Sequence, residues 1–284
     1  MSPRPIRSSG AASAWRDEVI PLDGAPPAML RIYGCAERCA GMPLVLHFHA
    51  GAFVGGGLDD GMGVAGLLVD AGAAVASLDY PLAPAHPFPQ AVEAGYAALQ
   101  WLERQRRRLA VTRAPLFVVG EEAGGNLAAA VAMMARDRAG PELAGQILLS
   151  PMLDVCVGTA SQRDAKAGPV GCRWADGWRA YLARDDDALH PYAAPGSAQR
   201  LAGLPPTLLA SAADDPLRDE TTAFAQRLRA AGVAVEIALL DEPTGWPRSY
   251  QSDQSGAPRP WAAALGRHLN QFLQHTTTTP GSTA

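Results

Sequence analysis

The sequence predicts an α/β fold built around one mostly parallel sheet. Short apolar strands alternate with amphipathic helices from about residue 15 onward, which is the pattern of repeated βαβ units. Some strands, such as residues 44–48, are almost entirely apolar, as expected for strands that helices cover on both faces. A length of 284 residues fits a single large α/β domain, which we expect over residues 15–275.

The first half of the chain is predicted to supply four strands and one long helix. The first two strands have no helix between them, so they should form an antiparallel pair at the start of the sheet. The third strand is the apolar run Leu44 to Phe48. In order, the strands are 15–22, 28–33, 44–48 and 73–78, and the helix is 89–109.

The second half repeats the alternation with one interruption. A buried strand runs directly into a helix that ends by Gly140, where glycine can adopt a left-handed cap conformation. Residues 155–200 break the rhythm with one helix, a charged run and Pro/Gly segments, so they are predicted to be a reduced cap at the rim of the sheet. Residues 1–14 and 276–284 have no hydrophobic pattern and are expected to be flexible. The elements are strands 116–120, 146–150, 207–211 and 233–240, and helices 123–140, 174–182, 216–231 and 261–273.

Composition and charge exclude several classes of function. The chain is 48% hydrophobic and 18% charged with a net charge of −4, so it resembles a soluble globular protein and offers no basic surface for nucleic acid. No apolar run is long enough for a membrane span or a signal peptide, which predicts a cytoplasmic protein. The four cysteines have no zinc or redox spacing, and we expect neither a metal nor a cofactor. A homodimer is compatible with the sequence.

Four segments stand out because each falls at a predicted strand end or loop. They are His47-Phe48-His49-Ala50-Gly51-Ala52-Phe53, Asp79 to Pro89, Gly120-Glu121-Glu122-Ala123-Gly124-Gly125-Asn126 and Asp215-Pro216-Leu217-Arg218-Asp219-Glu220. In this order they resemble the hormone-sensitive-lipase family of bacterial esterases, whose α/β-hydrolase fold places its active site at these points. The resemblance extends from about residue 15 to residue 273.

The resemblance implies a triad that is incomplete in this chain. The nucleophile of the family sits on a glycine-flanked strand-to-helix turn, and here Glu122 occupies that position between Gly120 and Gly124. Asp215 matches the triad acid. The loop 241–247, where the family carries its histidine, has none, so the histidine position near Gly245 is empty. The next histidine, His268, falls inside the last helix.

The resemblance also implies an oxyanion hole made of backbone N–H groups. By motif position these donors are Gly51, Ala52 and Ala123, because such groups must face the oxygen on which charge develops. His49 is interpreted as organising this loop by hydrogen bonds, or else as facing the pocket. Phe53 and Ala123 are expected to line a pocket above the turn, together with residues of the cap.

Three functional hypotheses remain from the sequence. The first is a pseudo-esterase that binds a small hydrophobic or ester-like ligand, or a protein partner, without hydrolysing it; the plant gibberellin receptor is a precedent in the same family. The second is a lyase or cyclase in which Glu122 is a general base. The third is a residual ester hydrolase that uses Glu122 as nucleophile or base. A carboxylate at position 122 could also accept hydrogen bonds from the oxyanion-hole donors and block them.

Overall fold

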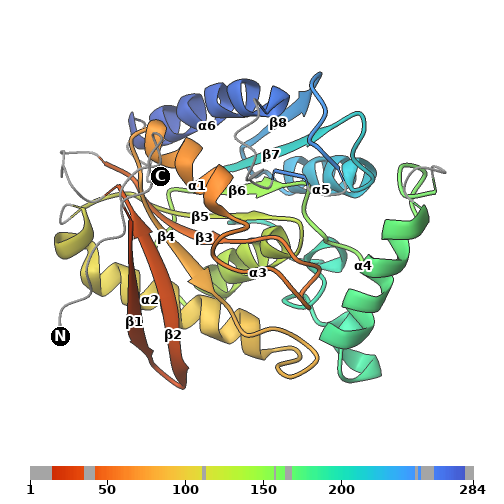
Figure 1. The fold of residues 1–284 in the computed structure, drawn as a ribbon, viewed down its shortest axis with the longest axis horizontal. Coiled ribbons are helices and arrows are strands. Elements are labelled where there is room, and N and C mark those ends of the chain that lie inside the picture. Colours follow the sequence, from red (N-terminus) through yellow and green to blue (C-terminus); the bar gives the residue numbers. More distant parts are fainter. Residues whose placement is uncertain are drawn as a thin grey trace.

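The computed structural model describes residues 15–34, 42–110, 113–156, 158–163, 168–246, 249–250 and 259–278. An eight-stranded sheet runs through the molecule in the order β1-β2-β4-β3-β5-β6-β7-β8 (Figure 1). β2 pairs antiparallel with β1 and with β4, and the remaining neighbours are parallel. This confirms the predicted, mostly parallel sheet with an antiparallel start. The strands are β1 (Trp15–Leu22), β2 (Ala25–Tyr33), β3 (Leu44–Phe48), β4 (Ala74–Asp79), β5 (Leu116–Glu121), β6 (Gly145–Leu149), β7 (Thr207–Ala212) and β8 (Val235–Leu240).

Helices cover both faces of the sheet, and this explains why its central strands are buried throughout and largely apolar. Every residue of β3, β5, β6 and β7 is buried, because side chains on both faces of these strands meet helices. One apolar cluster joins the sheet to α1 and α6, and the other joins it to α2, α3 and α5 (Figure 1). These helices are α1 (Met62–Asp70), α2 (Gln90–Leu109), α3 (Ala123–Asp137), α5 (Arg218–Ala230) and α6 (Pro260–Thr278).

Two helices differ from the sequence prediction. No helix was predicted over α1, where glycines at 63 and 66 interrupt the apolar pattern; the helix forms because Val64, Ala65 and Leu68 are buried against the sheet. Helix α6 runs to Thr278, so the expectation of a flexible tail from residue 276 is wrong for its first residues. There the Thr276 hydroxyl donates to the carbonyl of Phe272 at 2.8 Å within the last turns of the helix.

The end of α3 also corrects a prediction about glycine. The residue with positive φ is Ala139 (φ 48°), not Gly140. Gly140 is required for a different reason, since a Cβ added there would lie 2.3 Å from the Tyr96 hydroxyl oxygen. The close approach of a neighbouring helix, and not a left-handed cap, accounts for glycine at this position.

The segment between β6 and β7 forms a small cap. It contains helix α4 (Gly168–Tyr181) and two short 3-10 helices, η1 (Asp185–Leu189) and η2 (Pro195–Ser197). Figure 1 shows α4 set apart from the helices that cover the sheet faces. In the described part of the chain, no helix is long and apolar enough to cross a membrane, and no cluster of His, Cys, Asp or Glu could hold a metal. Cys156 is free and exposed, whereas Cys35 and Cys39 lie outside the described residues.

Candidate functional site

Glu122 sits on the sharp turn between β5 and α3. Its backbone adopts φ 53° and ψ −115°, a conformation that costs a residue with a side chain about 1–3 kcal/mol. Two glycines make the turn possible. A Cβ at Gly120 would lie 2.1 Å from the carbonyl oxygen of Gly124, and a Cβ at Gly124 would lie 2.2 Å from that of Phe48. The turn therefore has the geometry of a nucleophile elbow, with a carboxylate at its apex.

We expect Gly120→Ala to destabilise the protein by ~2–3 kcal/mol, because the new methyl group meets rigid backbone atoms on the other side of the turn. Gly66→Ala is the matched control. Gly66 lies inside α1 with no atom within 4 Å of an added Cβ, so alanine there should add up to ~1 kcal/mol through its better helix propensity. Urea unfolding of both variants tests the pair. Equal effects would mean that the turn is not tightly packed.

The carboxylate of Glu122 accepts hydrogen bonds from three N–H groups. Its Oε2 accepts from the backbone N–H of Gly51 at 2.6 Å and of Ala52 at 3.0 Å, and its Oε1 accepts from Trp174 Nε1 at 2.5 Å. The first two donors are those that the sequence assigned to the oxyanion hole. Positive φ angles at Gly51 (149°) and Ala52 (50°) shape the loop that carries them. Ala123, the third expected donor, is buried at the first position of α3.

Asp215 lies at the carboxyl end of β7 with 2% of its surface exposed. Its Oδ1 accepts from the backbone N–H of Leu217 at 2.9 Å, and the Ser249 hydroxyl lies 3.5 Å from its Oδ2. Burial raises the pKa of Asp215 to about 6, and the hydroxyl of Ser150 and the N–H of Leu217 oppose that rise. Asp215 is thus a buried carboxyl group surrounded mainly by hydroxyls.

Among the described residues of the loop after β8, Ser249 places its hydroxyl 3.5 Å from Asp215 Oδ2. The expectation that the empty histidine position lies near Gly245 stays a prediction, and the geometry at Gly245 does not favour it. Gly245 has φ 87°, which disfavours a side chain, and the nearest atom to a Cβ built there is Trp261 Nε1 at 3.8 Å. The sequence between these residues has no periodic pattern that could fix which position faces the acid.

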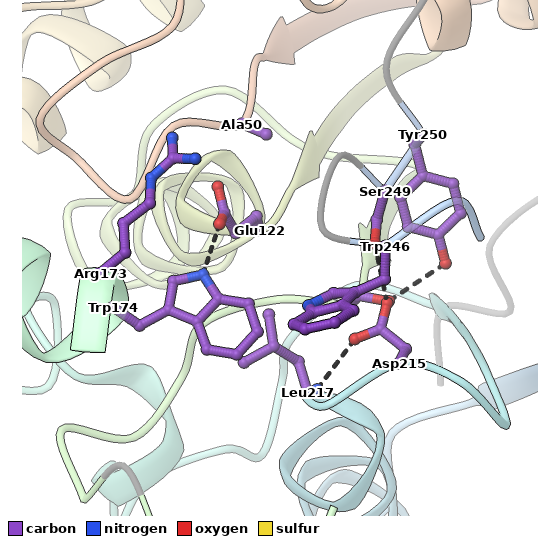
Figure 2. Close-up of a pocket in the computed structure, with 10 residues that line it drawn as sticks. Ala50, Glu122, Arg173, Trp174, Asp215, Leu217, Trp246, Ser249 and Tyr250 are labelled. Atoms are coloured by element: carbon purple, nitrogen blue, oxygen red, sulfur yellow. Dashed lines mark hydrogen bonds between the residues drawn. The ribbon is translucent and has the colours of Figure 1, made fainter. Parts of the chain in front are cut away.

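An open pocket of about 370 Å³, including the solvent at its mouth, joins Glu122 to Asp215. Figure 2 shows the indoles of Trp174 and Trp246 along it and the guanidinium of Arg173 near Glu122. None of the described residues that line it is a histidine. They are Ala50, Glu122, Ser150, Arg173, Trp174, Asp215, Leu217, Trp246, Ser249 and Tyr250.

Phe53 and Ala123 do not belong to this lining, contrary to the expectation. Phe53 is 1% exposed because its ring stacks on that of Tyr181 at 4.0 Å between centroids and also contacts Trp178 at 5.0 Å. Phe53 therefore fixes the cap helix α4 to the oxyanion loop. No sequence pattern singles out Trp174, Trp246, Ser249 or Tyr250, because each side chain reaches the pocket from an irregular segment or from the cap.

His49 contacts the backbone of the oxyanion loop and is not among the residues that line the pocket. Its Nδ1 lies 2.8 Å from the carbonyl oxygen of Ala50, and its ring stacks on Tyr80 at 4.2 Å. Burial lowers the pKa of His49, so the ring is neutral near pH 7. The other histidine of this motif, His47, is buried between Ser77 (2.8 Å) and Glu121 (2.9 Å). The contacts of His49 and His47 therefore favour a role in organising the oxyanion loop over direct contact with a ligand.

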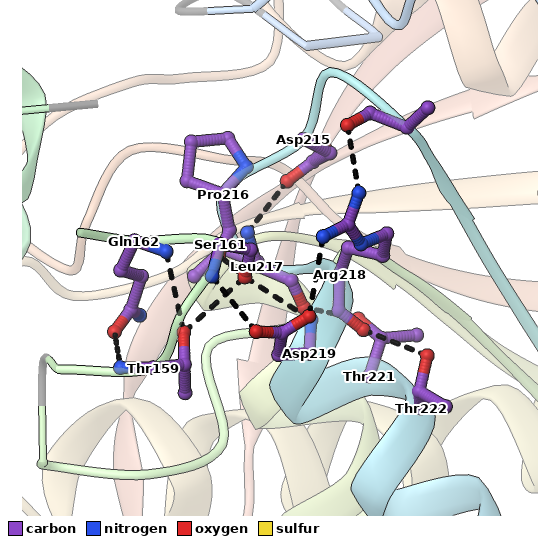
Figure 3. Close-up of polar contacts among 11 residues, drawn as sticks. Thr159, Ser161, Gln162, Asp215, Pro216, Leu217, Arg218, Asp219, Thr221 and Thr222 are labelled. Carbon is purple, nitrogen blue, oxygen red and sulfur yellow. Dashed lines mark hydrogen bonds and ion pairs between the residues drawn. The ribbon is translucent and has the colours of Figure 1, made fainter. Parts of the chain in front are cut away.

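A polar network ties the base of the cap to the start of α5, directly after Asp215 (Figure 3). The backbone N–H of Ser161 donates to Asp219 at 2.7 Å, and the Ser161 hydroxyl donates to the carbonyl of Pro216 at 2.6 Å. Glu220 adds a buried anchor, since its carboxyl group accepts from the N–H groups of Leu153 and Asp154. These hydrogen bonds therefore position both the base of the cap and the segment that carries Asp215.

Comparison with known proteins places the chain among hydrolases. The Abhydrolase_3 family model, which describes an alpha/beta hydrolase fold, matches residues 45–243. The chain belongs to this family. It is 38% identical over 231 residues to Esterase LipI of Mycobacterium tuberculosis, covering 76% of this chain and 70% of that protein. It is 35% identical to Carboxylesterase NlhH of the same species, covering 80% and 73%.

Solved structures agree with this assignment. The esterase LipW from Mycobacterium marinum superposes with a TM-score of 0.79 at 34% identity, covering 95% of this chain and 84% of that one. Similarity is not limited to esterases. A gibberellin receptor of Arabidopsis thaliana is 30% identical, covering 72% of this chain and 62% of the receptor. Family membership thus establishes an esterase/lipase-type hydrolase fold and esterase relatives.

Removal of the Trp174 donor should loosen the cap. We expect Trp174→Phe to lose about 2 kcal/mol of stability, since a hydrogen bond to a charged acceptor contributes ~1.5–3 kcal/mol. Trp246→Phe is the control for lost volume, because Trp246 Nε1 has no hydrogen-bond partner among the described residues. Chemical unfolding measures both. If Trp246→Phe costs as much as Trp174→Phe, the bond to Glu122 adds nothing.

Proposed function

We propose that the protein is a pseudo-esterase: a member of the esterase/lipase family whose pocket binds a small organic molecule without hydrolysing it. The observation that carries the proposal is the carboxylate of Glu122 bound to the N–H groups of Gly51 and Ala52. In an ester hydrolase these donors stabilise the oxyanion of the tetrahedral intermediate. Here an internal anion already holds them.

The nucleophile, the oxyanion hole and the base that acyl transfer needs are each replaced or blocked in this site. The elbow presents a carboxylate in place of a hydroxyl, and a substrate carbonyl oxygen would have to displace Glu122 Oε2 from donors at 2.6 and 3.0 Å. Asp215 faces the hydroxyl of Ser249 where a triad would place an imidazole base. The N-terminus of α3 further favours the negative charge of Glu122 in this position.

The same contacts weigh against the two catalytic alternatives. A general base for lyase or cyclase chemistry needs an oxygen that is free to reach the substrate proton, whereas both oxygens of Glu122 already accept hydrogen bonds from the protein. A nucleophilic Glu122 would form an acyl-enzyme that needs an activated water for its release, and the pocket supplies no histidine for that step. Ligand binding requires neither a free base at Glu122 nor an activated water, so it is the function that these groups support best.

A thermal-shift screen tests the proposal. A ligand present at 100 times its dissociation constant should add about 2.7 kcal/mol of stability, which raises the melting temperature by several degrees. Esters among the hits should be recovered intact after long incubation, as measured by chromatography. Ester consumption above the buffer rate that Glu122→Gln abolishes would show instead that the carboxylate is catalytic.

A further inference from the structure

Two carboxyl groups face the pocket, and they differ in the number of hydrogen-bond donors that stabilise their charge. Glu122 accepts from three N–H groups within 3.0 Å. Asp215 is 2% exposed; one backbone N–H, that of Leu217, donates to it within that distance, and the Ser150 hydroxyl is a further hydrogen-bond partner. The Ser249 hydroxyl is 3.5 Å away, beyond the usual 2.5–3.0 Å of an O–H···O bond. A buried carboxylate with one N–H donor and neutral hydroxyls for partners is less well stabilised than one with three N–H donors, so Asp215 gains more than Glu122 from a bound cation.

The walls next to Asp215 suit a cation with an apolar body. Figure 2 shows the indoles of Trp174 and Trp246 between Glu122 and Asp215, and Leu217 beside them. Indole faces attract ammonium and guanidinium groups by ~0.5–2 kcal/mol, depending on desolvation. The same faces give a flat organic body a surface on which to stack.

The positive charge in the lining does not oppose this arrangement. Arg173 is the only Lys or Arg among the described lining residues, and Figure 2 shows it on the Glu122 side, away from Asp215. Its side chain is exposed, so solvent and salt screen its charge. The Asp215 end of the pocket therefore keeps a negative character at neutral pH.

We propose that the pocket binds a compact organic cation, a protonated amine on a flat apolar body, with its charge against Asp215 and its body between the two indoles. This inference rests on the proposed ligand-binding function and specifies the chemistry of the ligand. The cation takes the place next to the acid that an imidazolium takes in a working triad.

Three probes of similar shape but different charge test the inference. Calorimetric titration of the unmodified protein near neutral pH with benzylamine, benzyl alcohol and benzoate compares a cation, a neutral molecule and an anion. We expect benzylamine to bind about 10-fold tighter than benzyl alcohol, and benzoate to bind weakest. Asp215→Asn should remove this preference for the amine. Asp176→Asn, which removes an exposed carboxyl of α4 outside the pocket, should leave it unchanged.

The possible outcomes separate this inference from the proposed function. Equal binding of benzylamine and benzyl alcohol overturns the charge preference but leaves a ligand-binding pocket in place. Tightest binding of benzoate, lost in Arg173→Gln, overturns it in favour of an anion site. Failure of all three probes also overturns it, whereas turnover of esters would contradict the proposed function alone. If Asp215→Asn does not fold, the charge series on the unmodified protein decides.

Discussion

The double variant Glu122→Ser with Ser249→His is expected to hydrolyse short-chain aryl esters about 10²–10³ times faster than buffer alone, whereas the unmodified protein should show no turnover above buffer. Loss of triad members in serine hydrolases removes ~10⁶ of rate and leaves ~10³ from the oxyanion hole and binding. This chain has an acid of the triad type and an elbow of the right shape. The two substitutions supply the missing hydroxyl and imidazole at the positions that the structure assigns to them.

Neither single variant should gain much, because the two groups act as a unit. Glu122→Ser frees the N–H groups of Gly51 and Ala52, but the described lining has no histidine to take the proton of its hydroxyl. Ser249→His places an imidazole next to Asp215, but Glu122 still occupies the oxyanion donors. Steady-state assays with an aryl acetate compare the four proteins, and Glu122→Ala with Ser249→His is the control without a nucleophile. Equal rates in that control and in the double variant would exclude a serine mechanism.

The fold could be predicted from the sequence because its signal is repeated and local. Apolar runs such as Leu44–Phe48 and Leu116–Glu121 mark strands buried on both faces, and amphipathic segments between them mark helices. The sequence does not predict helix α1 because Gly63 and Gly66 interrupt the pattern of its buried residues, Val64, Ala65 and Leu68. The end of α6 was missed because threonines, which are weak helix formers in isolation, here extend a helix that is already packed.

The site could be predicted only where a backbone motif fixes it. Glu122 between two glycines and Asp215 at the end of a strand follow from such motifs. Trp174, Trp246 and Ser249 do not, because they reach the pocket from the cap and from an irregular loop, where one residue of register changes which side chain faces inward. Phe53 was assigned to the wrong environment for a related reason. Whether it lines the pocket or supports the cap depends on the position of α4, which the sequence does not specify.

Glu220 couples the stability of the cap base to pH. It is buried between α5 and the segment after β6, where its carboxyl group accepts from the backbone N–H groups of Leu153 and Asp154, and from Gln162 Nε2 at 2.8 Å. Burial raises the pKa of Glu220 from 4.5 to about 8, and the two backbone N–H groups oppose that rise. The folded protein therefore takes up a proton at this residue that the unfolded chain releases above pH ~4.5.

The sign of the pH effect follows from the raised pKa. The contribution of Glu220 is fully present below the unfolded pKa and is lost as pH rises through the folded value of about 8. Asp215, whose pKa is about 6, acts in the same sense at lower pH, and His49, whose pKa is lowered from 6.5, acts in the opposite sense up to that pH, so Glu220 is the main contributor between pH 6 and pH 8. Over these two pH units the free energy of unfolding should fall by roughly 2–3 kcal/mol, since each unit corresponds to ~1.4 kcal/mol per proton.

Glu220→Gln should flatten this fall, because an amide stays neutral at every pH while its oxygen can still accept from the N–H groups of Leu153 and Asp154. We expect the variant to approach or exceed the stability of the unmodified protein at pH 8 and to be no more stable than it at pH 5. Urea unfolding at intervals from pH 5 to pH 8 measures the difference, with Glu142→Gln, at an exposed carboxyl, as the control for net charge. A slope that Glu220→Gln leaves unchanged would mean that Glu220 is ionised in the folded protein, held by its three donors.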